Sequence, residues 1–147
     1  MPRNVNASEK LVKEVIEAFG QADLAPLYAA LDEKIIWKAA STIRDGKFIF
    51  GGCHEGRAGV VAHLSKLQTA YFFARAEAKE IVSAGEIVWC LFEFEANYVP
   101  RDGLRVRKPL AVEAAMRVTV RNGKILTLQT FFDTAALLVQ QGELAAG

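Results

Sequence analysis

The sequence has few of the residues that hold small proteins together or bind metals. Its two cysteines, Cys53 and Cys90, form no CxxC motif and have no cluster of histidine or cysteine around them. HxxxH, HxH and histidine–carboxylate spacings are also missing. We therefore expect free thiols in a reducing compartment, no disulfide framework, no metal site and no cofactor.

An excess of charge of one sign and long apolar runs are missing as well. The 18 basic and 17 acidic residues leave a net charge of +1, whereas nucleic-acid-binding proteins usually carry a basic face. No apolar run approaches the roughly 18 residues that cross a membrane, and the first residues lack the apolar core of a signal peptide. These absences predict a cytoplasmic protein that binds neither nucleic acid nor a membrane.

What is present is typical of one globular domain. The chain has 147 residues, of which 52% are hydrophobic and 24% charged, a balance that can bury a core without covalent staples. Linkers, repeats and low-complexity stretches are missing. We expect a single domain over residues 1–147.

Two hydrophobic periodicities follow each other along the chain. Helical spacing predicts helices from Ser8 to Gly20, after Asp23, from Gly56 or Gly59 onward, and from Asp133 or Thr134 to Gly142. Alternation predicts strands at 33–40, 48–52, 76–83, 86–99, 106–121 and 124–133, with turns at 45–47, 84–85, 100–103 and 121–123.

Helices followed by long antiparallel strands indicate an α+β fold. Strands of this length must twist and coil, so the sheet has a concave side. We expect a cone-shaped α+β barrel, in which a curved, mostly antiparallel sheet wraps around the N-terminal helices. The inside of such a cone is a natural pocket.

Three stretches carry a resemblance to a known family: DLAPLYAALDEKIIW, EGRAGVVAHL and VRNGKILTLQTFFDTAAL, in this order. The sequence resembles the SnoaL-like, nuclear transport factor two-like superfamily, near its ketosteroid-isomerase-related branch. This resemblance implies a homodimer that pairs through the outer sheet face. It leaves the activity open, because the superfamily includes several enzyme types and non-catalytic binders.

The catalytic residues of the ketosteroid isomerases do not carry over. The resemblance places their aspartate base at Ala39, and their oxyanion-hole tyrosine and aspartate at Val15 and Met116. None of these three side chains can hold or move a proton, so steroid isomerisation of the known kind is excluded.

The limonene-type epoxide hydrolases match no better. Their central Asp–Arg pair falls near Glu93 and Glu95, and their second aspartate becomes Thr130. The pair that holds the water becomes roughly Trp37 and Ala39. One acidic position is kept and its partners are lost.

Glu93 and Glu95 are nevertheless the main catalytic candidates. Residues two apart on a strand share a face, roughly 6–7 Å apart, and desolvation on an apolar wall would raise at least one carboxyl pKa. In that case Glu95 carries a proton and Glu93 tunes it. The alternative is a solvated polar face, with both glutamates paired to Arg105, Arg107 or Arg117.

Strand alternation also predicts the lining of the pocket. The residues expected to face inward and bind the ligand are Trp37, Trp89, Leu91, Met116, Leu128, Thr130 and Phe132. Those expected on the outer, dimerising face of the long strand are Cys90, Phe92, Phe94, Ala96 and Tyr98. A slip of one residue would instead point Phe92 and Phe94 inward.

Four further residues have a proposed role. His54 lies in a turn-like segment expected near the pocket mouth, where it or Tyr98 could act as a secondary donor. His63 lies inside the third helix, which favours a structural role, and Asp133 is placed to cap the last helix.

Two functions remain open at this point. The first is an enzyme or binder for a small, apolar, cyclic ligand, with cofactor-free acid–base chemistry if it is an enzyme. The second is a non-catalytic domain that binds a ligand or a partner protein.

Overall fold

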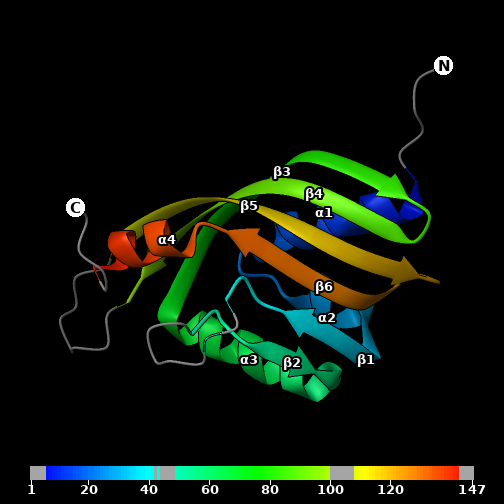
Figure 1. The fold of residues 1–147 in the computed structure, drawn as a ribbon, viewed down its shortest axis with the longest axis horizontal. Coiled ribbons are helices and arrows are strands. Elements are labelled where there is room, and N and C mark those ends of the chain that lie inside the picture. The colour runs from blue at the N-terminus through cyan, green and yellow to red at the C-terminus, as the bar shows by residue number, and fades with distance from the viewer. Residues whose placement is uncertain (1–5, 42, 44–48, 100–107, 143–147) are drawn as a thin grey trace.

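The structure is a computed structural model and describes residues 6–41, 43, 49–99 and 108–142. It confirms the predicted α+β fold: a curved, unclosed sheet with helices packed on its concave side (Figure 1). The helices are α1 (Ala7–Phe19), α2 (Ala25–Ala30), α3 (Gly56–Ala70) and α4 (Thr134–Gln141). The strands are β1 (Leu31–Lys38), β2 (Cys53–Glu55), β3 (Tyr71–Ala84), β4 (Ile87–Tyr98), β5 (Lys108–Arg121) and β6 (Lys124–Phe132).

The sheet joins its strands in the order β2-β1-β6-β5-β4-β3. Strands β3 to β6 form the predicted antiparallel meander, whereas β1 pairs with β6 in parallel. The strand expected at 48–52 is wrong in its position, because β2 begins only at Cys53. The turns expected at 45–47 and 100–103 lie outside the described residues.

The helix ends follow ordinary capping chemistry. Asn6, not Ser8, caps α1, because its side-chain oxygen accepts a hydrogen bond from the Glu9 N–H at 2.8 Å. Asp133 caps α4 as predicted, accepting from the Ala136 N–H at 2.9 Å. Such caps satisfy backbone donors that the first helical turn leaves without partners.

Irregular pairing bends the sheet. In β3 the register against β4 shifts between Phe73 and Arg75 and again between Ala78 and Glu80. Bulges of this kind increase the local twist and curve the strand. The curved strand passes over α1, and α3 packs against β1 at the other side of the concavity.

The core fills the space between the sheet and the helices. Its most deeply buried members, Ile35, Val60, Leu64, Val88 and Val118, come from both layers. No helix among the described ranges is long and apolar enough to cross a membrane.

Candidate functional site

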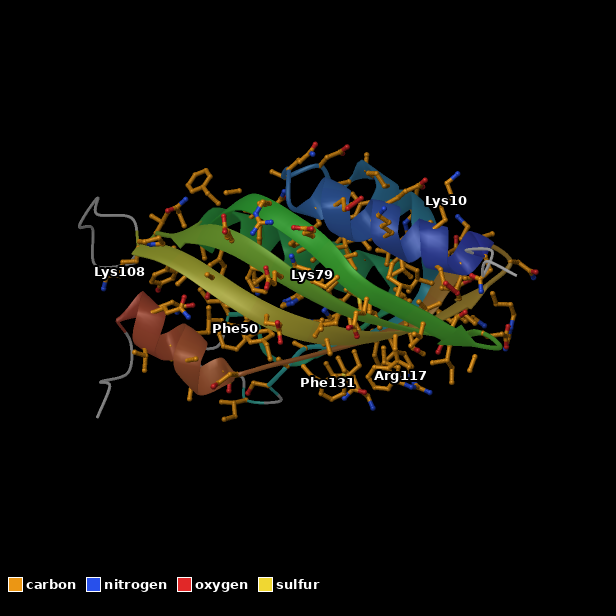
Figure 2. The ribbon with its side chains drawn as sticks, turned by 90° about the horizontal axis from the view of Figure 1, so that it is seen from above. Lys10, Phe50, Lys79, Lys108, Arg117 and Phe131 are labelled. Atoms are coloured by element: carbon orange, nitrogen blue, oxygen red, sulfur yellow. The ribbon has the colours of Figure 1, made fainter. Side chains whose placement is uncertain are left out.

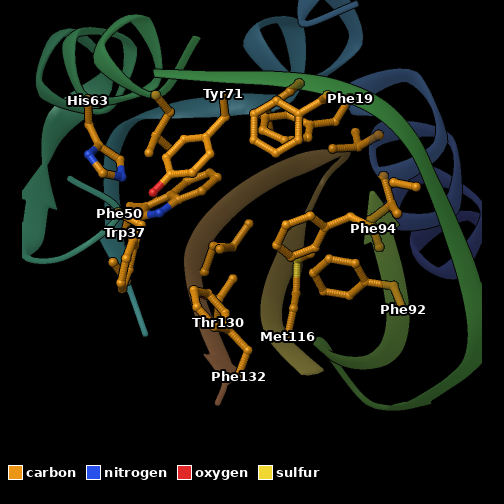
Figure 3. A pocket seen from close by; sticks show the side chains of 18 of the residues that line it. Phe19, Trp37, Phe50, His63, Tyr71, Phe92, Phe94, Met116, Thr130 and Phe132 are labelled. Carbon is orange, nitrogen blue, oxygen red and sulfur yellow. The ribbon is translucent and has the colours of Figure 1, made fainter. Parts of the chain in front are cut away.

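A partly open cavity of about 120 Å³ lies inside the cone. It is bounded by the concave face of the sheet and by side chains of α1, α2, α3 and α4 (Figure 3). Its aromatic lining consists of Phe19, Trp37, Phe50, Tyr71, Phe73, Phe92, Phe94 and Phe132. A concave, mostly apolar space with few polar groups is the usual form of a small-molecule site.

The polar groups of the cavity are few. Among the described lining residues, His63, Tyr71, Thr130 and the indole of Trp37 carry polar atoms, and none has a charged side chain. The Tyr71 hydroxyl donates a hydrogen bond to the buried side-chain oxygen of Gln141 in α4. The described part of the chain also brings together no group of acidic, histidine and cysteine residues that could hold a metal ion.

Five of the residues predicted to line the pocket do so. Met116 in β5 lies opposite Thr130 in β6, and both face the cavity. The others are Trp37, Leu128 and Phe132. Their inward placement agrees with the strand alternation, while their role in binding a ligand stays a prediction.

The predicted register of β4 is wrong by one residue. Cys90, not Trp89, lies opposite Met116, so Phe92 and Phe94 enter the cavity lining. Trp89 and Leu91 face outward, and the Trp89 ring stacks on Phe131 at 6.2 Å. Burying two phenylalanine rings favours this register.

Glu93 and Glu95 therefore lie on the outer face and cannot act on a ligand inside the cone. Their side chains are 39% and 51% exposed. Arg75 of β3 lies 3.1 Å from the Glu95 carboxylate, and Lys79 lies 3.6 Å from that of Glu93. The alternative of a solvated, paired face fits this arrangement, with described partners from β3. Of the partners predicted for the glutamates, Arg105 and Arg107 lie outside the described residues.

The apolar residues predicted on the outer face of β4 point inward instead. Cys90, Ala96 and Tyr98 belong to the buried core. Tyr98 packs 5.4 Å from the Tyr71 ring, behind the lining and not in it. Burial raises the pKa of the Cys90 thiol to about 11, so the thiol stays protonated and unreactive at neutral pH.

His54 lies behind the cavity lining. It is half-buried in β2, opposite Trp37 in β1. Its Nε2 lies 3.0 Å from the Gly51 carbonyl oxygen, and since a carbonyl only accepts, Nε2 carries the proton. Its ring stacks on His63, with centroids 3.8 Å apart and an angle of 17°.

His63, for which the sequence analysis favoured a structural role, lies where it could act on a ligand. It is only 4% exposed, yet it lines the cavity. Burial first, and then the nearby charges of His54 and Lys66, lower its pKa from 6.5 to about 4. Its spacing of three, one and four residues from Val60, Leu64 and Leu67 places it on the buried face of α3, which is a signal that the sequence contains.

The comparisons with known proteins agree with this architecture. The family model of the SnoaL-like domain matches residues 12–127. No curated protein sequence matches the chain. Solved structures do resemble the chain, but their sequence identities to it are so low that they support a shared fold and nothing more.

Three of these structures show the extent of the likeness. A provisionally assigned isomerase from Rhodopseudomonas palustris is 16% identical, with a TM-score of 0.71, covering 98% of this chain and 100% of its own. A provisionally assigned polyketide cyclase from Xanthomonas campestris is 21% identical, with a TM-score of 0.71, covering 90% and 95%. A protein of ketosteroid isomerase-like fold from Catenulispora acidiphila, in complex with trimethylamine, is 15% identical, with a TM-score of 0.73, covering 92% and 95%.

Proposed function

The chain belongs to the SnoaL-like domain family, and from this premise we propose that it binds a small, apolar, cyclic molecule inside the cone. The observation that carries the proposal is the cavity of about 120 Å³ with its apolar lining, which is rich in aromatic rings. Aromatic rings offer large apolar contact area and prefer tilted or offset partners. A planar ring of one or two cycles fits such a lining.

Binding is better supported than carboxylate catalysis. Glu93 and Glu95 lie outside, and none of the described lining residues has a carboxylate. Among the described lining residues, the imidazole of His63 is the candidate for acid–base chemistry on the ligand. The provisional assignment of a similar structure as a polyketide cyclase supports cyclic organic ligands as the class to test.

Trp37 provides a direct readout of binding. The chain has two tryptophans, and Trp89 lies on the outer face with 42% of its surface exposed. In a Trp89→Phe variant, Trp37 is the remaining tryptophan. Titration with naphthalene or 2-naphthol should change the Trp37 fluorescence saturably, because these rings would enter the cavity that Trp37 lines.

A matched pair of variants separates binding in the cavity from binding on the surface. Thr130 and Thr127 lie on the same strand, but Thr130 lines the cavity and Thr127 bonds to Thr119 on the outer face. Thr130→Phe should fill the cavity and weaken binding at least about tenfold, or about 1.4 kcal/mol. Thr127→Phe should leave the affinity unchanged. Equal affinities in both variants would reject the cavity as the binding site.

For the partner, we propose a second copy of the same chain. The outer face carries an apolar patch formed by Val82, Trp89, Leu91, Ala115 and Phe131. Figure 2 shows Phe131 beside Arg117, on the side of the sheet away from α1. A patch of this kind is typical of a protein–protein contact.

The charges around this outer apolar patch suit a twofold contact. Ala115 lies near its centre, between Leu91 and Phe131 on the neighbouring strands. Glu113 and Arg117 stand two residues to either side of Ala115, and neither forms an ion pair within the described part of the chain. A twofold axis through Ala115 would bring each Glu113 to the Arg117 of the other copy.

A further inference from the structure

The imidazole of His63 is a buried polar group that the fold leaves without a partner. It is 4% exposed, and within the described ranges no hydrogen bond reaches its ring. The contacts that hold it are aromatic: the His54 ring stacks on it, and the Trp37 ring lies edge-on at 6.4 Å. Buried polar groups are nearly always hydrogen-bonded, so this exception needs an explanation.

The free imidazole nitrogens are open to the cavity. No side-chain nitrogen or oxygen in the described chain is fully sealed from solvent without a hydrogen-bond partner. Since His63 has no such partner, its ring nitrogens keep some accessible surface, and the cavity is the space that the ring lines. Figure 3 shows the ring beside Trp37, with one of its nitrogens on the side of Trp37 and the pocket.

The charge state of His63 defines what it can recognise. The ionisable groups that face it are His54 from β2 and Lys66 from its own helix, and both disfavour a positive charge on its ring. Trp37 from β1 is uncharged. At neutral pH the ring therefore presents one N–H donor and one bare nitrogen acceptor. The ring therefore suits an uncharged polar group, which can accept a hydrogen bond from the ring N–H or donate one to the bare nitrogen.

The rest of the cavity narrows the ligand class. With no charged side chain among the described lining residues, a carboxylate or ammonium group would be buried without a counter-ion, at considerable cost. The Tyr71 hydroxyl is already bonded to Gln141. The indole N–H of Trp37, beside His63, can only donate a hydrogen bond, whereas the His63 ring can both donate and accept.

We propose that His63 is the hydrogen-bonding partner of the ligand and selects an uncharged aromatic ring that bears a hydroxyl or carbonyl group. This inference rests on the proposed function and adds the polar group by which the ligand is recognised.

Calorimetric titration at pH 7.5 with three matched probes tests the selection. Naphthalene, 2-naphthol and 2-naphthoate share their rings and differ in a hydrogen, a hydroxyl or a carboxylate. We expect 2-naphthol to bind about tenfold more tightly than naphthalene, as one added hydrogen bond allows. We expect 2-naphthoate to bind more weakly than 2-naphthol.

Two variants assign the preference to His63. His63→Leu replaces the imidazole by an apolar side chain of similar size that can neither donate nor accept a hydrogen bond. Within this variant the preference for 2-naphthol over naphthalene should therefore be lost, whatever the affinity for naphthalene itself. His63→Gln retains a donor and an acceptor and should recover part of that preference.

The possible outcomes distinguish a failure of this inference from a failure of the proposed function. Equal binding of naphthalene and 2-naphthol to the wild type, a preference that survives in His63→Leu, or tightest binding of 2-naphthoate would each overturn the inference alone. If none of the three probes binds, the proposed function fails with it.

Discussion

At the scale of single residues, His63 couples the ligand cavity to the stability of the fold. Its pKa falls to about 4 in the folded protein, against 6.5 for a free histidine, chiefly because of burial. Between these two values the unfolded chain binds a proton that the folded chain does not. Above pH 6.5 the lowered pKa of His63 therefore costs the fold no stability. Below pH 6.5 it destabilises the fold, and this destabilisation grows as the pH falls toward 4.

A urea-denaturation series should reveal this penalty. As the pH decreases from 7.5 to 4.5, the free energy of unfolding should fall, with a contribution from His63 on the order of 2–3 kcal/mol. His63→Leu removes the titrating ring and should show a correspondingly smaller decrease. Parallel pH profiles for the two proteins would contradict the lowered pKa.

The errors of the sequence analysis also arise at this scale. Around residues 88–92 both faces of β4 are apolar, so alternation cannot decide which face is inside. The glutamates that follow were placed inward by resemblance, and the basic residues that hold them outside, Arg75 and Lys79, lie in a neighbouring strand whose register is shifted twice. Only the three-dimensional pairing settles this choice.

At the scale of elements, the position of α1 depends on a glycine. Gly20 ends α1 in ordinary helical geometry, so it is not required for its backbone conformation. It is required for space, because an added Cβ would lie 2.7 Å from the Cβ of Ala76 and closer still to its backbone nitrogen. The helix end and β3 touch through their backbones, which brings Ile16 and Phe19 to the cavity.

Alanine substitutions at two glycines should therefore have opposite effects. Gly20→Ala forces α1 away from β3 and should lower the free energy of unfolding by about 1–3 kcal/mol. Gly59 in α3 has no atom within 4 Å of an added Cβ. Gly59→Ala should therefore raise the free energy of unfolding by about 0.5–1 kcal/mol, because alanine has the better helix propensity. Thermal denaturation of both variants measures the difference, and a neutral Gly20→Ala would refute the close contact.

Elements were easier to predict than their partners. Alternation located β1, β4, β5 and β6 to within a few residues, and helical spacing located all of α1 to α4, because these patterns are local. The parallel pairing of β1 with β6 has no local signal, since it depends on where a distant strand ends up after the meander closes. The start of β3 was missed for another reason, because its bulges interrupt the alternation of apolar and polar residues.

At the scale of the whole molecule, the outer apolar patch predicts a dimer whose strength depends on charge. Sedimentation equilibrium should show a dimer for the wild type. Arg117→Glu would set two acidic side chains against each other across the twofold axis and should weaken association at least about tenfold. Adding Glu113→Arg to the same chain swaps the charges and should restore the dimer. A wild type that stays monomeric, or a double variant that fails to recover, would reject this interface.

The parallel pairing of β1 with β6 has a consequence for the order in which the chain can fold during synthesis. On the ribosome, β1 emerges about ninety residues before the strand that lies beside it in the finished sheet. Until then one edge of β1 has no hydrogen-bonding partner, and the cavity has no wall on that side. Completion of the sheet must therefore wait until β6 has left the exit tunnel, so the nascent protein passes through a long interval with its aromatic interior uncovered, when chaperone protection matters most.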